Sequence, residues 1–213
     1  MFDCPTVTSG PSHVHQTVSL ASGPLRLLQP AEAAELPDDG AVEWAPLVPY
    51  WAVLWRSGVA LAQELDGAEL RGIRVVELGC GLGAPSIAAA RAGASVLATD
   101  EDPEALELVA RNARLNDVRV ETARVDWWDP DGLVERGPFD LVLAADVLYT
   151  KANVDAALAL FPRLVAPGGE LRIADPNRAG AQRFLAAFEV VSEPGPDVSL
   201  HTIRFAARPA GHT

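Results

Sequence analysis

The feature that most constrains this sequence is a regular alternation, from Leu70 onward, of short apolar runs and helix-like segments. The apolar runs, which are rich in β-branched residues, fall at residues 73–78, 95–100, 118–126, 139–146, 170–175 and about 200–207. Helix-like patterns of about ten to fifteen residues separate most of them, which is typical of βαβ units. The interiors of the runs are almost continuously apolar, as burial on both faces of a sheet requires. The sequence therefore predicts an α/β fold with a mostly parallel sheet and helices on both faces.

Several helix boundaries are indicated by local residues. Asp102 precedes Pro103, which is the arrangement of an N-cap followed by proline at the first helical position. Residues 154–165 carry a continuous apolar stripe and are followed by a Pro-Gly-Gly turn at 167–169, which predicts that the helix ends there. A further helix is expected over about 177–188.

The chain of 213 residues has the length of one large α/β domain. Residues 1–20 are mostly polar, and we expect them to form a flexible N-terminal arm. A single domain is expected over 21–213, with a cap segment at 21–69 and the α/β core at 70–213. Within the cap, one side of a helix that ends at Gly67 is expected to carry Trp51, Leu54, Trp55, Ala62 and Leu65.

Charge and composition exclude several classes of function. The chain has 17 Lys and Arg residues against 29 Asp and Glu residues, a net charge of −12, whereas nucleic-acid backbones and anionic membranes require a basic surface. Two cysteines imply no disulfide framework, and the four histidines lie outside any metal-ligand spacing, so no metal is predicted. Neither a membrane span nor a secretory signal is visible, which favours a cytoplasmic location. The oligomeric state is left open.

A glycine-rich turn follows the first core strand. Its sequence is Glu77-Leu78-Gly79-Cys80-Gly81-Leu82-Gly83, and glycines here permit a tight turn and let a ligand lie against backbone amides. The spacing is G-x-G-x-G, not the G-x-G-x-x-G of dinucleotide-binding folds. Glu77 suits an ammonium group better than a pyrophosphate. The turn therefore predicts S-adenosylmethionine, a cationic cofactor that carries an amino acid, in preference to NAD.

Acidic residues end the next two strands. Asp100 ends the second strand, where a carboxylate can accept from both ribose hydroxyls. Asp126 and Trp127 end the third strand, where a carboxylate can accept from the adenine amino group and a ring can pack against the base. Each acid alone also fits a surface position beside a structural turn. Their occurrence at successive strand ends favours a cofactor site, because ligands bind beyond the carboxyl ends of strands in such sheets.

Motifs along the chain resemble those of a known family. The segment VVELGCGLGAPSIAAARAGASVLATD resembles motif I and the strand-two acid of class I, seven-β-strand, S-adenosylmethionine-dependent methyltransferases. The preceding PYWAVLW, the Asp126-Trp127 pair and the Asp146-Val147-Leu148-Tyr149 segment resemble the family-16 branch of protein lysine methyltransferases. The resemblance covers about residues 25–178 and implies a Rossmann-like fold with a seven-stranded sheet. It also implies cofactor contacts from Glu101 and Ala145.

Asp146 and Tyr149 are the candidate catalytic residues. If a helix begins there, residues three apart lie on one side, and a carboxylate and a phenol can hold an incoming amine by hydrogen bonds. Asp146 can also bind the protonated amine and accept its proton. The plainer alternatives are a helix N-cap for Asp146 and a packing role for Tyr149.

Other residues of the cap and the strand ends have open roles. Trp55 is expected to contact the cofactor, because aromatic faces attract a sulfonium cation. Trp51 fits either the same aromatic wall or an apolar anchor, and Arg56 fits either the cofactor carboxylate or an acidic surface. Asp175 is most simply a helix N-cap, with a position near the acceptor as the alternative. Trp128 has no assigned place.

The leading functional hypothesis is a methyltransferase that methylates lysine side chains of a protein partner. A small-molecule N-methyltransferase, acting on a nicotinamide-like amine or a specialised metabolite, would use the same cofactor residues. A non-catalytic cofactor-binding protein is a third class. Methylation of nucleic-acid bases is disfavoured, because Val147-Leu148 stands where related DNA enzymes carry a proline pair and the net charge is −12.

Overall fold

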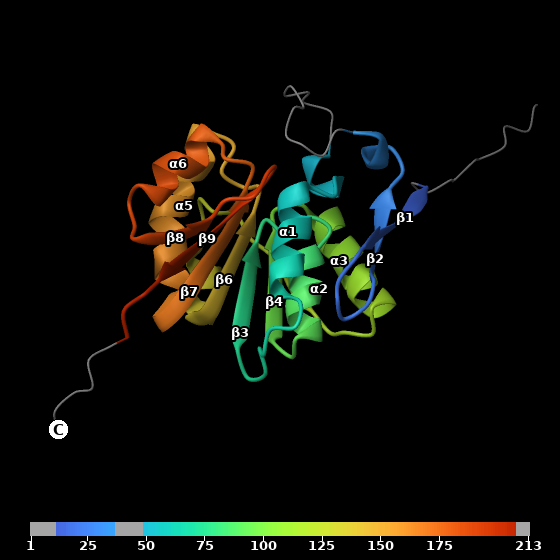
Figure 1. The fold of residues 1–213 in the computed structure, drawn as a ribbon, viewed down its shortest axis with the longest axis horizontal. Coiled ribbons are helices and arrows are strands. Elements are labelled where there is room, and N and C mark those ends of the chain that lie inside the picture. Colours follow the sequence, from blue (N-terminus) through green and yellow to red (C-terminus); the bar gives the residue numbers. More distant parts are fainter. Residues whose placement is uncertain (1–11, 37–48, 208–213) are drawn as a thin grey trace, which may run out of the picture.

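The predicted sheet is present in the computed structural model, which describes residues 12–36 and 49–207 (Figure 1). Its seven strands have the order β5-β4-β3-β6-β7-β9-β8. They are β3 (Arg74–Leu78), β4 (Ser95–Asp100), β5 (Glu121–Arg124), β6 (Phe139–Ala145), β7 (Val165–Asp175), β8 (Val190–Glu193) and β9 (Ser199–Arg204). Strands β3 to β7 pair in parallel, and β9 pairs antiparallel with both β7 and β8. The α/β fold class and the mostly parallel sheet are confirmed.

Helices cover both faces of this sheet (Figure 1). One face carries α1 (Arg56–Leu65), α2 (Ala84–Arg91) and α3 (Pro103–Leu115), and the other carries α4 (Asp131–Arg136), α5 (Lys151–Leu164) and α6 (Ala179–Leu185). Each face of the sheet has its own hydrophobic core, and successive residues of a strand pack into different cores. Val75 packs with α1 and α2, whereas Val76 packs with α5. Burial on both faces explains the continuous apolar runs of the sequence.

An N-terminal hairpin lies beside α3, formed by β1 (His13–Val18) and β2 (Leu25–Pro30) (Figure 1). The side-chain amide of Asn112 accepts from the Leu28 N–H at 2.7 Å and donates to the Leu28 carbonyl at 3.2 Å. The flexible arm expected over residues 1–20 is therefore wrong for β1. The backbone of β1 pairs with β2 from His13 to Val18, and the polar pattern of the sequence does not reveal this pairing. Residues 1–11 lie outside the described residues.

The cap helix is shorter than its sequence pattern predicts. Tyr50–Ala52 forms a 3₁₀ turn (η2), and a second 3₁₀ turn, η1, spans Ala33–Glu35. Trp55 is extended, with φ −65° and ψ 142°, and its N–H donates to the Val53 carbonyl at 3.1 Å. The prediction that Trp51 and Trp55 share a helix face is wrong, because the chain does not continue the i→i−4 hydrogen-bond ladder through residues 51–55.

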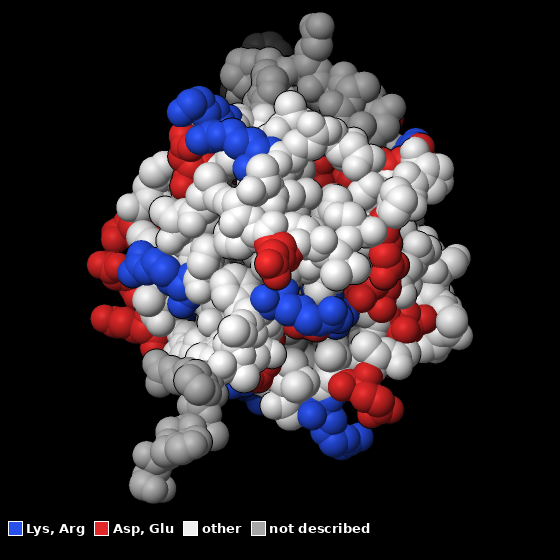
Figure 2. Space-filling model, turned by 60° about the vertical axis from the view of Figure 1, so that its left-hand side comes forward, with Lys and Arg blue, Asp and Glu red and all other residues white. Residues whose placement is uncertain are grey.

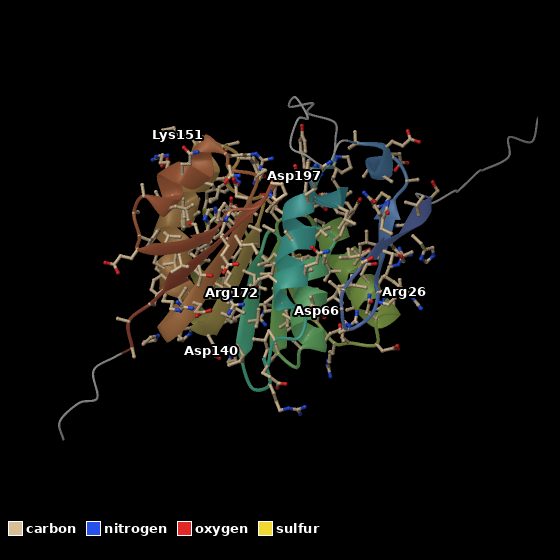
Figure 3. The ribbon with its side chains drawn as sticks, in the orientation of Figure 1. Arg26, Asp66, Asp140, Lys151, Arg172 and Asp197 are labelled. Atoms are coloured by element: carbon tan, nitrogen blue, oxygen red, sulfur yellow. The ribbon has the colours of Figure 1, made fainter. Side chains whose placement is uncertain are left out.

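Charged contacts attach α1 to the rest of the fold. Asp66, just after α1, accepts from the N–H of Ser22 at 3.0 Å (Figure 3). Arg172 on β7 pairs with Glu64 of α1 at 2.7 Å and with Glu170 at 2.8 Å. Because α1 also contacts β6, β7 and β9, the residues at its N-terminus are fixed relative to the carboxyl ends of these strands.

Two smaller differences concern element ends. Helix α5 ends at Leu164 and β7 begins at Val165, so the Pro-Gly-Gly segment lies within β7 and not at a helix terminus. The pairing of β6 with β7 has a register shift between Phe139 and Leu141. The predicted N-cap is confirmed: Asp102 accepts from the Glu104 N–H at 2.8 Å, and Pro103 begins α3. None of the helices in the described ranges is long and apolar enough to cross a bilayer.

Candidate functional site

A cavity of about 400 Å³ lies at the carboxyl ends of β3, β4 and β6, closed on one side by residues 50–58. All the predicted site residues except Asp126 line it: Trp55, Glu77, Gly79, Gly81, Gly83, Asp100, Glu101, Trp127, Ala145, Asp146 and Tyr149. Trp51 and Trp128, whose roles the sequence left open, line it as well. Tyr50, expected in the same aromatic wall as Trp51 and Trp55, is a lining residue, and the polar lining residues that the sequence reasoning missed include Thr150 and Asn153.

The glycine turn forms one wall of this cavity. Gly79, Gly81 and Gly83 all have positive φ, at 69°, 49° and 77°. A Cβ at Gly81 would lie 2.7 Å from the carbonyl oxygen of Trp51, and one at Gly79 would lie 2.9 Å from Val147. Glycine is therefore required both by backbone conformation and by the close approach of neighbouring segments. The result is a wall of bare backbone facing the cavity.

Asp100 links this turn to the end of β4. Its Oδ2 accepts from the Gly81 N–H at 3.0 Å, and its Oδ1 accepts from the Asp102 N–H at 3.1 Å. Burial raises the pKa of this carboxyl, and the two backbone hydrogen bonds oppose the rise. The carboxylate is therefore held in one orientation at the cavity wall, where its remaining lone pairs can accept from ligand hydroxyls.

Glu77 has a second role that the sequence reasoning did not foresee. Its Oε2 accepts from the backbone N–H of Ser86 at 2.9 Å and from the Ser86 hydroxyl at 2.5 Å. The side chain is almost fully buried, and this burial raises the pKa of the carboxyl to about 8. Glu77 thus stabilises the first turn of α2 while it also lines the cavity.

The end of β5 differs from the sequence expectation. Asp126 is exposed and does not line the cavity; its Oδ1 accepts from the Trp128 N–H at 2.8 Å and so shapes the loop. Trp127 lines the cavity and packs edge-to-face on Phe161, with ring centroids 5.1 Å apart. The structure thus brings the indole ring, and not the carboxylate, to the position expected for the base.

Asp146 and Tyr149 lie together at the cavity without a helical turn between them. Asp146 has a φ of 60°, and its N–H donates to the Ala174 carbonyl at 2.9 Å. Helix α5 begins only at Lys151, with Thr150 as the N-cap, so both the helical spacing and the N-cap alternative for Asp146 are wrong. Tyr149 is 43% exposed, and partial burial of its hydroxyl raises its pKa.

Arg178 is the neighbour of Asp146 that the sequence reasoning missed. Its Nη1 forms an ion pair with Asp146 Oδ1, and the Asp146 side chain is only 5% exposed. Asp175 Oδ1 accepts from the Arg178 backbone N–H at 2.7 Å, and Asp175 does not line the cavity. The N-cap of α6 is Arg178, so the N-cap interpretation of Asp175 is wrong. Burial raises the pKa of Asp175 to about 6. Asp175 ends the fifth predicted strand and Arg178 follows three residues later, so an arginine shortly after a strand-end acid was the available clue.

Comparison with known proteins places this site in a family. A family model described as "Lysine methyltransferase" matches residues 51–189. The chain belongs to the lysine methyltransferase family. This range contains every predicted site residue and Arg178.

Two relatives illustrate the family. An electron transfer flavoprotein beta subunit lysine methyltransferase from Xenopus laevis is 39% identical over 137 residues, which cover 62% of this chain and 54% of the relative. Protein N-lysine methyltransferase METTL21A from Danio rerio is 35% identical over 120 residues, covering 53% and 55%. The chain therefore spans about half the length of the curated relatives it matches.

A solved structure shows the same fold. The 16S rRNA N2 G1207 methyltransferase RsmC of T. thermophilus, solved with AdoMet and guanosine, has a TM-score of 0.66. Its sequence identity is 18%, and the match covers 92% of this chain and 51% of RsmC. The likeness supports the methyltransferase fold of this family member.

The remaining candidate, Arg56, does not line the cavity. Arg56 pairs with Asp197 at 3.4 Å, and Asp197 lies above α1 (Figure 3). This pair agrees with the acidic-surface alternative for Arg56. Among residues 12–36 and 49–207, no group of three or more His, Cys, Asp or Glu side chains is placed to hold a metal ion.

Proposed function

We propose that the protein is an S-adenosylmethionine-dependent methyltransferase that methylates lysine side chains of a protein. The observation that carries the proposal is a single cavity that joins the glycine turn and Asp100 to Asp146 and Tyr149. Membership of the lysine methyltransferase family supports the reaction class. The two relatives described above are named as lysine methyltransferases of proteins, which supports a protein acceptor.

The residues of the cavity fit the cofactor. A volume of about 400 Å³ lies within the usual range for small-molecule sites, roughly 300–1,000 Å³. The bare backbone at Gly79 and Gly81 suits close approach of the amino-acid part, and Asp100 suits ribose hydroxyls. Trp55 and Trp127 supply aromatic faces on two sides, and such faces attract cations. When bound, the cofactor supplies an electrophilic methyl group on a positively charged sulfur.

The chain's own residues would align the acceptor. Asp146 can accept a hydrogen bond from the amine, and Tyr149 lines the same cavity. Together they would direct the nitrogen lone pair toward the methyl group, and positioning of this kind can lower a reaction barrier by about 7–11 kcal/mol. The apolar side chains of Leu54, Val147 and Trp55 line the same cavity and would reduce the contact of the reacting atoms with water.

The test is methyl transfer from cofactor labelled on the methyl group to cell extract and to a panel of small amines. We expect the purified full chain to label proteins, with the label mapping to lysine by mass spectrometry. Label found only in small amines would replace the proposal with the small-molecule alternative. Binding of the cofactor without any transfer would favour a non-catalytic protein.

Variants connect the activity to the cavity. Asp146→Asn should lower the transfer rate at least tenfold, because the amide can no longer act as a charged acceptor, while affinity for S-adenosylhomocysteine stays within a few-fold. Asp131→Asn makes the same chemical change in α4, where the side chain is 82% exposed, and should leave the rate unchanged. Equal loss in both variants would contradict the assignment of Asp146.

A further inference from the structure

The candidate catalytic carboxylate is already neutralised by the protein itself. Arg178 Nη1 forms an ion pair with Asp146 Oδ1, and the Ser57 hydroxyl donates to Asp146 Oδ2 at 3.4 Å. The Asp146 and Arg178 side chains are only 5% and 23% exposed, and Ser57 is fully buried. The positive charge of Arg178 therefore cancels the negative charge of the Asp146 carboxylate.

The two partners approach Asp146 from outside the cavity. Asp146 lines the cavity, whereas Arg178 and Ser57 do not. The guanidinium therefore does not occupy the space that an acceptor would need. It lies on the side of the carboxylate that is turned away from the cavity. The cavity wall therefore presents the Asp146 carboxylate, and the Asp146–Arg178 pair as a whole has no net charge.

The backbone keeps this arrangement in place. The N–H of Asp146 donates to the Ala174 carbonyl at 2.9 Å, which ties the end of β6 to β7. The N–H of Arg178 donates to Asp175 Oδ1 at 2.7 Å, which ties the start of α6 to the same strand. Asp146 and Asn177 both adopt left-handed backbone conformations, with φ of 60° and 65°. Residues in such conformations persist only where surrounding contacts hold them, and they concentrate at functional sites.

This charge balance decides which form of an amine can bind. Methyl transfer needs a nitrogen with a free lone pair, so an alkylammonium must lose its proton before it reacts. A lone buried carboxylate would stabilise the ammonium and raise its pKa, whereas a nearby guanidinium lowers it. Loss of hydration inside a partly apolar cavity disfavours the charged form further.

We propose that Arg178 is a positioning residue that neutralises Asp146, so that the site binds the acceptor amine in its uncharged, nucleophilic form. The inference rests on the proposed function, because it describes the acceptor side of the same cavity. It also separates the two roles that the sequence left open for Asp146. The carboxylate accepts a hydrogen bond from a neutral amine and is not the counter-ion of an ammonium.

Other ionisable groups also face this region and would be common to all variants of the pair. They are Glu77 from β3, Cys80 from the glycine turn, Asp100 and Glu101 from the end of β4, Tyr50 from the cap, Tyr149 from the loop after β6, and Asp175 from β7. Arg56 at the start of α1 is engaged with Asp197. A comparison among variants of Asp146 and Arg178 alone cancels the contributions of these neighbours.

The test measures binding and not transfer. The full chain, saturated with S-adenosylhomocysteine, is titrated with n-butylamine at pH 7, 8 and 9, and the dissociation constant is followed by calorimetry. The pKa of this amine is near that of lysine, about 10.4, so its uncharged fraction rises about tenfold per pH unit over this range. For the wild type we expect the affinity to rise about tenfold per pH unit.

Three variants test whether the charge of Arg178 sets the pH dependence of amine binding. Arg178→Gln leaves Asp146 without its counter-ion, and its affinity for the amine should stay nearly constant between pH 7 and 9, because the ammonium form then binds. Arg178→Lys keeps the positive charge and should retain the wild-type slope. The double variant Asp146→Asn with Arg178→Gln again has a neutral pair and should regain the slope, which a purely structural role of Arg178 does not predict.

Several results would overturn the inference: no binding of n-butylamine by the wild type at any pH, a wild-type affinity that does not rise with pH, or a slope unchanged in Arg178→Gln. If Arg178→Gln does not fold, the wild-type slope and the double variant still decide. Because the readout needs no turnover, a failure to methylate protein lysines would count against the proposed function alone. The binding result would stand or fall separately.

Discussion

At the scale of single residues, Gly81 has the tightest surroundings in the glycine turn. Alanine at this position would place its Cβ 2.7 Å from the Trp51 carbonyl oxygen at a φ of 49°. We expect Gly81→Ala to lower the free energy of unfolding by about 2 kcal/mol or more and to weaken S-adenosylhomocysteine binding. Urea unfolding and calorimetry measure the two effects.

Gly132→Ala is the matched control for this change. Gly132 lies within α4, and a Cβ there meets nothing within 4 Å. Because alanine is the better helix former, this variant should be as stable as the wild type or up to about 1 kcal/mol more stable. Similar losses in both variants would show that the surroundings of Gly81 have no special importance.

The buried carboxyl of Glu77 makes a second residue-scale prediction. Its pKa is raised to about 8 in the folded protein from an ordinary value of 4.5. Between these values the folded state binds the proton and the unfolded state has lost it. The contribution of Glu77 to stability is therefore complete below about pH 4.5 and is lost as the pH rises toward 8.

Glu77→Gln removes this titration while keeping an oxygen that can accept from Ser86. Relative to the variant, the wild type should lose about 4 kcal/mol of unfolding free energy between pH 5 and 8. Denaturant titrations of both proteins over this range measure the difference, in which the shift of Asp175 cancels. A difference that stays constant with pH would contradict the raised pKa.

At the scale of elements, Asn112 of α3 connects the N-terminal hairpin to the cofactor wall. Its amide exchanges two hydrogen bonds with the backbone of Leu28 and donates to the Leu82 carbonyl in the glycine turn at 3.1 Å. Asn112 is fully buried. Asn112→Ala should therefore cost about 2–3 kcal/mol of unfolding free energy, together with affinity for S-adenosylhomocysteine.

Asn116, one turn later, separates the two effects. It makes the same pair of contacts with the backbone of Arg26, at 2.9 and 2.6 Å, but none with the glycine turn. Asn116→Ala should destabilise the protein less, because this site is more exposed, and should leave cofactor affinity unchanged. An equal loss of affinity in both variants would rule out the link through Leu82.

The elements also show what sequence could and could not predict. Strand ends were predictable, because the parallel sheet brings Glu77, Asp100 and Asp146 to one edge wherever the helices lie. The start of α1 was not, because apolar spacing does not distinguish a helix from the extended conformation at Trp55. Arg178 was missed for a different reason: its partner is 32 residues away in sequence, and only the pairing of β6 with β7 joins them.

Asp126 illustrates the same limit on a shorter scale. The residue stands at the strand end that the rule indicates, but its side chain caps the Trp128 N–H and turns away from the cavity. Whether a strand-end acid faces a ligand or closes its own loop depends on one or two backbone dihedrals. Sequence patterns fix the position of such a residue along the sheet edge and leave its direction open.

At the scale of the whole molecule, the chain carries a net charge of −12. On the face shown in Figure 2, basic and acidic side chains are interspersed. Some opposite charges are paired, as Asp155 is with Lys151 and Arg183. The net negative charge creates a field that favours the approach of a basic acceptor more than it favours any one contact.

A long-range effect of this kind depends on ionic strength. The screening length falls from about 30 Å at 0.01 M salt to about 8 Å at 0.15 M. For a peptide with basic residues around the acceptor lysine, kcat/KM should therefore fall about tenfold between these conditions. A peptide with the same lysine between uncharged residues should change little, because the neutralised Asp146 pair contributes no long-range field. Equal salt sensitivity of the two peptides would place recognition in short-range contacts at the cavity mouth, where Trp128 and Tyr149 are exposed.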